Sequence, residues 1–170
     1  MSGAILQPPC RAAADFGVIF KLGTNDLRPD GRNSCDVAGL PILPGLVRYD
    51  EISHGEIKHA IRLTMRNTFQ GYIHPATHYA SSSTDSNLPP MGLRVRLKAS
   101  VDISHLPPQA RIVAVAMKRY GMILADNGSS WYVSGAPDPR WSNDDLHTLG
   151  RITGSDFEVV DTSSLPHPGQ

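Results

Sequence analysis

An excess of charge of either sign is missing from this sequence. Its 170 residues contain 16 Lys and Arg and 16 Asp and Glu, so the formal net charge is zero. A neutral chain has no overall field that attracts a polyanion, and counterion release would add little to nucleic-acid binding. The basic run of Arg94, Arg96 and Lys98 lacks the interleaved aromatic residues on which bases stack. We therefore expect no nucleic acid among the partners.

Long apolar runs and cysteines are also scarce. No stretch approaches the roughly 18 apolar residues of a membrane span, so we expect no membrane partner. The start of the chain, MSGAILQPPC, has no basic residue ahead of its short apolar patch and is not a secretion signal as it stands. The localisation stays open. Cys10 and Cys35 match no zinc or redox spacing, and whether they pair also stays open.

Self-contained catalytic signatures are absent too. The chain has neither a G-x-S-x-G elbow nor an S-x-x-K pair, and it has no EF-hand pattern. The hydroxyl-rich run at 81–83 therefore has no motif that would make one of its serines a nucleophile. A polar loop is the favoured interpretation of residues 79–92, and loops this long tend to be functional or disordered.

Short strand patterns separated by polar turns make up most of the chain, which contains 15 Gly and 14 Pro. They predict an α+β fold, mostly an antiparallel, sandwich-like sheet with two short helices. We expect a flexible tail at 1–15, a single globular domain at 16–162 and a second tail at 163–170. The expected strands are 16–22, 57–65, 71–74, 92–100, 122–125, 131–134 and 157–161. The expected helices are 107–121 and 142–150, with a helical turn in 48–56 that Asp50 caps.

The segment 57–65 alternates with period two. Ile57, Ile61 and Leu63 share one face, and His59 lies on that same face. We therefore expect His59 to be at least half buried. If this strand pairs antiparallel with the expected strand 71–74, a turn near 67–70 sets His74 roughly opposite residues 62–64. We expect residues 122–125 and 131–134 to form a hairpin around the turn 126–130.

Three histidines are candidate metal ligands. His74 precedes a proline, which favours extended backbone, so H-P-A-T-H is no helical metal motif. A turn would bring His78 toward His74, and His59 of the neighbouring strand would be the third ligand. Three neutral imidazoles suit zinc or copper, with an open position for water. The alternative is that these histidines form structural hydrogen bonds.

The leading functional hypothesis is a metal-dependent hydrolase of a small neutral substrate, with a lactone, ester or sugar linkage. The metal would activate water, Asp85 or Asp126 would act as general base or extra ligand, and Tyr120 would donate to the developing oxyanion. Calcium is the other candidate cofactor, held by oxygens near Asp126 and Asp138.

A cluster of aromatic residues supports the alternative hypothesis. Trp131, Tyr132 and Trp141 lie close together in the sequence beside polar residues. Such residues line sugar-binding pockets, so the alternative is a non-catalytic carbohydrate-binding module. The same pattern is also that of alternating strand residues, with one of Trp131 and Tyr132 buried and the other capping the strand. A third possibility is a structural fragment of a larger exported protein.

Several segments resemble a bacterial family of hypothetical proteins, often exported. They are AGLPILPGLVRYDEI (38–52), IKHAIRLT (57–64), YIHPATH (72–78), PPMGLRVRLKA (89–99), YGMILADNGSSWYVSGAPDPRW (120–141) and GSDFEVVDT (154–162). The resemblance implies a β-rich extracellular protein and places His59, His74, His78, Tyr120 and Asp126 in the family's recurring segments. It assigns them no roles, because the family has no settled activity. Family members are usually longer at the N-terminus, where this chain has a short tail.

Overall fold

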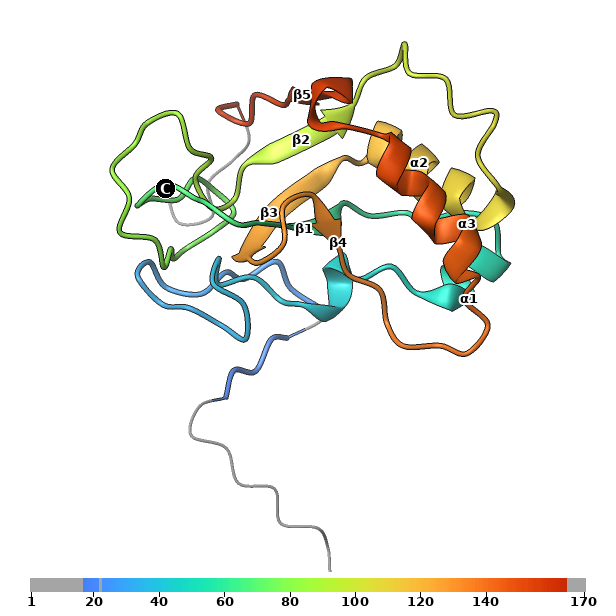
Figure 1. Cartoon of the computed structure of the whole chain (residues 1–170). Helices are drawn as coiled ribbons and strands as arrows, with labels where there is room; N and C mark the ends of the chain where they lie inside the picture. The colour runs from blue at the N-terminus through green and yellow to red at the C-terminus, as the bar shows by residue number, and fades with distance from the viewer. Residues whose placement is uncertain (1–16, 22, 165–170) are drawn as a thin grey trace, which may run out of the picture.

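The structure, a computed structural model, describes residues 17–21 and 23–164 (Figure 1). The expected tail at 1–15 lies outside the described residues, as do residues 165–170 of the second tail and Cys10. Cys35 is an exposed free thiol. In the described part of the chain, no helix has the length and apolar character that crossing a bilayer requires.

A five-stranded mixed sheet and three short α-helices make up the protein, which confirms the predicted α+β class. The strands are β1 (Ile61–Met65), β2 (Arg94–Leu97), β3 (Met122–Asn127), β4 (Tyr132–Val133) and β5 (Phe157–Val159). Their order across the sheet is β4-β1-β3-β2-β5. The central pair β1–β3 is parallel, and the β4–β1, β3–β2 and β2–β5 pairs are antiparallel.

Three strand predictions were wrong. Residues 122–125 and 131–134 form no hairpin, because β1 lies between β3 and β4. Segment 71–74 does not pair with β1 and makes only an isolated bridge from Tyr72 to Met91. Residues 17–21 belong to no strand. The interior position of β1 agrees with its burial: Ile61 and Leu63 are at most 1 % exposed and belong to the core cluster that includes residues of α2.

The helices follow the local sequence signals more closely. They are α1 (Tyr49–Ser53), α2 (Pro108–Arg119) and α3 (Asn143–His147), with 3₁₀ turns η1 (Leu43–Gly45), η2 (Thr148–Arg151) and η3 (Gly154–Asp156). Proline occupies the first turn of α2, and the helix is followed by Gly121 at φ +72°. The Ser142 side chain caps α3 by accepting from the Asp145 N–H. Arg48, and not Asp50 as expected, is the N-cap of α1.

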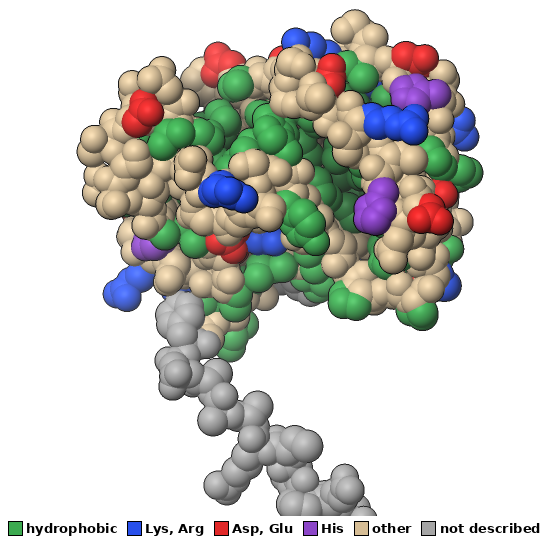
Figure 2. Space-filling model, in the orientation of Figure 1, with side chains coloured by type: hydrophobic (Ala, Val, Ile, Leu, Met, Phe, Trp, Pro, Cys, Tyr) green, Lys and Arg blue, Asp and Glu red, His purple; other side chains and the backbone are tan. Residues whose placement is uncertain are grey.

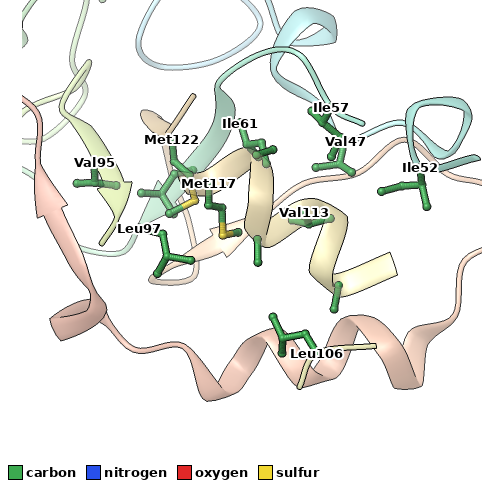
Figure 3. Packing of buried hydrophobic residues seen from close by; sticks show 14 residues of the cluster. Val47, Ile52, Ile57, Ile61, Val95, Leu97, Leu106, Val113, Met117 and Met122 are labelled. Carbon is green, nitrogen blue, oxygen red and sulfur yellow. The ribbon is translucent and has the colours of Figure 1, made fainter. Parts of the chain in front are cut away.

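The main core lies between the sheet and α2. Val113 and Met117 of α2 face Ile61 of β1, Met122 of β3 and Leu97 of β2 (Figure 3). A second apolar cluster on loops and β3 contains Ala38, Ala76, Met91, Leu124 and Ala125. Figure 1 shows the helices gathered at one end of the molecule and the long connection from β1 to β2 looping out at the other.

Candidate ligand-binding cleft

A cleft of about 660 Å³ opens beside the main core. Sheet residues, α2, the segment from α3 through η2, and Phe157 of β5 form its walls. Figure 2 shows a hollow on this face whose inner surface consists of hydrophobic side chains. Its apolar walls include Val47, Val113, Met117, Met122, Val133, Leu146, Leu149 and Ile152, and its aromatic residues are Trp131, Tyr132, Trp141 and Phe157. We call this site the aromatic cleft.

Both tryptophans of the chain line the aromatic cleft. The Trp131 ring stacks on Phe157 with a centroid distance of 4.8 Å and an interplanar angle of 24°. The indole also lies against Gly154, where a Cβ would be 2.9 Å from Trp131 Cζ2. A side chain at residue 154 would therefore displace the Trp131 indole from this position.

The backbone that presents Trp131 is strained. Trp131 has φ +58° and is the one non-glycine residue with positive φ in the described part of the chain. A bulky residue there costs on the order of 1–3 kcal/mol, and such strain is often found at functional sites. The turn before it is anchored to the sheet, because the Thr64 hydroxyl donates to the Ser129 carbonyl at 2.7 Å.

Trp141 is fixed in a different way. Its Nε1–H donates to the Ala136 carbonyl at 2.8 Å, and its ring meets Tyr49 edge to face at a centroid distance of 5.1 Å. Tyr132 is 59 % exposed, so its ring is available at the cleft. The three aromatic residues that the sequence grouped together thus line one cleft.

The chemistry of the lining is uncharged. Asp, Glu, Lys and Arg are missing from the described residues that form the cleft, and its side chains with polar groups are those of Ser130, Trp131, Tyr132, Trp141, Asn143 and His147. Small-molecule sites of about 300–1,000 Å³ typically combine apolar walls with a few such polar groups. The lining therefore favours a neutral ligand with both apolar and hydrogen-bonding surfaces.

The candidate metal ligands lie elsewhere. His59 donates from Nδ1 to the Ala60 carbonyl at 2.9 Å, and its Nε2 lies 3.1 Å from Glu51 Oε1. Its side chain is 20 % exposed, which confirms that it is at least half buried. His78 Nδ1 donates to the Val37 carbonyl at 3.0 Å, and His74 lies in the loop that starts beyond β1. Among residues 17–21 and 23–164, no three or more His, Cys, Asp or Glu side chains are grouped to hold a metal.

The other candidate calcium and catalytic groups are dispersed. Asp85 lies in an exposed turn and accepts from Asn87. Tyr120 ends α2 and Asp126 is near the far end of β3, and the strand from Met122 to Asp126 alone extends about 13 Å at roughly 3.3 Å per residue. Asp138 is paired with Arg140, whose hydrogen bonds lower the pKa of Asp138 to about 2. The metal-dependent hydrolase stays a prediction of the sequence, without a shared site for these residues.

A buried charge cluster was missed by the sequence analysis. Asp36 is 4 % exposed, and burial raises its pKa to about 6. Its Oδ1 accepts from the Leu40 N–H at 2.9 Å, while Oδ2 has no hydrogen-bond partner in the part of the chain described. Arg62 lies nearby on β1; it contacts Asp126 at 3.5 Å and donates to Ser134 Oγ at 3.0 Å. None of these residues lines the aromatic cleft. The cluster places the loop that carries Asp36 next to Arg62 of β1 and Asp126 of β3.

Comparison of the chain with protein-family models, with curated proteins and with solved structures found no match. The resemblance to the bacterial family therefore stays an expectation, and the geometry of the aromatic cleft is the main guide to function.

Proposed function

We propose that the protein binds a neutral carbohydrate in the aromatic cleft. The observation that carries this proposal is the combination of an aromatic-lined cleft of about 660 Å³ with a lining that has no Asp, Glu, Lys or Arg among the described residues. A pyranose ring has an apolar face of C–H groups and a rim of hydroxyls. It therefore matches apolar walls interrupted by a few hydrogen-bonding groups.

The aromatic residues would supply most of the contact area. Trp131 and Tyr132 are 39 % and 59 % exposed, so each retains ring surface that a ligand can cover. Aromatic side chains bury a large area on binding and lose little conformational freedom, so they contribute much of the binding energy at many sites. Ser130 and Asn143 offer a hydroxyl and an amide for sugar hydroxyls, and His147 offers a ring nitrogen.

A fluorescence titration tests the proposal, because both tryptophans report from the cleft. The probes are neutral oligosaccharides of β-1,4-linked glucose, xylose and N-acetylglucosamine. At least one should change tryptophan emission saturably. Calorimetry with the same sugar should show Trp131→Ala binding at least tenfold more weakly, a loss of about 1.4 kcal/mol.

The matched control is Leu43→Ala. Leu43 is a 56 % exposed hydrophobic residue outside the cleft lining, so its removal should leave the affinity unchanged. Equal weakening by both substitutions, or no binding of any of these sugars at millimolar concentration, would contradict the proposal.

A further inference from the structure

A second cavity of about 340 Å³ adjoins the aromatic cleft. Ser130, Trp131 and Phe157 line both spaces, so the stacked Trp131 and Phe157 rings form a common wall. The other lining residues of the second cavity do not line the cleft, and they include Asn67 and Val159. Each space is large enough to accept part of a ligand.

The Trp131–Phe157 stack brings together residues from the two opposite edges of the sheet. Trp131 directly precedes the edge strand β4, and Phe157 begins β5, the edge strand on the opposite side. The indole therefore reaches across the sheet face to a residue of the far edge. The positive φ of Trp131 directs the side chain there, and the indole packs closely against Gly154.

The second cavity has nearly the same chemistry as the first. Its charged lining residue is Glu158, whose carboxylate accepts from Arg96 Nε of the neighbouring strand at 2.9 Å. The charge of Glu158 is thus matched by Arg96, and Asn67 and Ser130 supply neutral polar groups. A ligand that continues from the cleft into this space would meet a similar, mainly apolar surface, in which Glu158 is paired with Arg96.

We infer that the ligand is an extended neutral oligosaccharide, whose successive units occupy both cavities across the Trp131–Phe157 stack. The inference rests on the proposed function and adds the class of ligand to it. A monosaccharide occupies only part of one cavity, whereas a chain long enough to pass the Trp131–Phe157 stack gains contacts in the second cavity as well. Such linked contacts raise affinity well beyond that of either unit alone.

The test measures affinity against ligand length by calorimetry, for sugars of one to six units in the three series named above. The affinity should rise at least tenfold between the shortest binding sugar and the longest. Val159→Asp should remove this gain and leave the short sugar's affinity intact. Val159 is 66 % exposed, so the added carboxylate should not disturb the core.

Ile73→Asp is the matched control. Ile73 is an exposed hydrophobic residue outside both cavities, and its substitution should preserve the gain with length. Thermal unfolding of both variants checks that they fold. Affinity that does not depend on length would overturn the inference while the proposed function stands. Equal weakening of short and long sugars by Val159→Asp, in a folded variant, would overturn it as well. Failure of every sugar to bind would overturn both proposals.

Discussion

Substitution of Asp36 by asparagine tests the buried charge cluster. The Asp36 side chain is buried beside Arg62 and Asp126, and desolvation raises its pKa from 3.8 to about 6. A shift of about two units corresponds to roughly 3 kcal/mol by which ionised Asp36 destabilises the folded state. Asparagine keeps an acceptor oxygen for the Leu40 N–H and the Ser34 hydroxyl but carries no charge.

The sign of the pH dependence follows from the direction of the shift. Below the unfolded-state pKa of 3.8, Asp36 is protonated in both states and contributes no difference. Between that value and about 6, the folded state keeps a proton that the unfolded state has lost, so the free energy of unfolding falls as pH rises. Above about 6 the loss is complete. From pH 4 to pH 7 the Asp36 contribution should fall by about 2 kcal/mol.

Urea unfolding at pH 4, 5, 6 and 7 measures this contribution as the difference between wild type and Asp36→Asn. The stability of the variant relative to wild type should increase by about 2 kcal/mol across the range. Asp102→Asn is the control, because Asp102 is exposed and hydrogen bonds to Ser104 lower its pKa. It should leave the wild-type slope above pH 5 unchanged. A constant difference between Asp36→Asn and wild type, or one of opposite slope, would refute the reasoning.

Three further predictions concern the fold and the metal hypothesis. Ser142→Ala should lower the free energy of unfolding by about 1 kcal/mol, since it removes the cap of α3, whereas Ser100→Ala in an exposed turn should change it little in the same urea assay. Ile61→Ala should cost about 2–5 kcal/mol, because Ile61 is fully buried, and a loss below 1 kcal/mol in urea unfolding would contradict its place in the core. The metal hypothesis predicts about one zinc per chain by elemental analysis after reloading, binding that weakens below pH 6, and loss of the zinc in His74→Ala and His78→Ala. Zinc-free protein after reloading would contradict it.

The helices could be predicted because their ends are encoded locally. Proline in the first turn of α2, Gly121 after its end and the Ser142–Asp145 cap of α3 each act within a few residues. The buried face of β2 could also be predicted locally, because Val95 and Leu97 alternate with polar residues and are buried as expected.

Strand neighbours could not be predicted from local signals. The turn 126–130 has the composition of a hairpin loop, yet β4 does not pair with β3. It pairs with the edge of β1 that faces away from β3. The parallel β1–β3 ladder joins residues about sixty positions apart, such as Ile61 and Met122. Pairing of β1 with β3 on one side and β4 on the other joins distant segments, and period-two alternation alone does not reveal it.

The candidate site was predicted in part. Trp131, Tyr132 and Trp141 stand out in the sequence, and the structure places all three at one cleft. The contribution of Phe157 could not be foreseen, since it approaches Trp131 from the opposite edge of the sheet. Asp36 was missed because it lies in a polar stretch that is typical of exposed loops, whereas the apolar residues after it fold the loop onto the sheet.

The most direct test of the carbohydrate proposal is an NMR titration of ¹⁵N-labelled protein with the tightest-binding of the neutral oligosaccharides. The chain has two indole N–H groups, and both belong to residues of the aromatic cleft. The account predicts that the Trp131 indole resonance shifts saturably, together with backbone resonances of Tyr132 and Asn143, while those of His74 and His78 stay in place. Indole resonances that do not move up to saturating sugar, or shifts confined to the loop that carries His74 and His78, would contradict it.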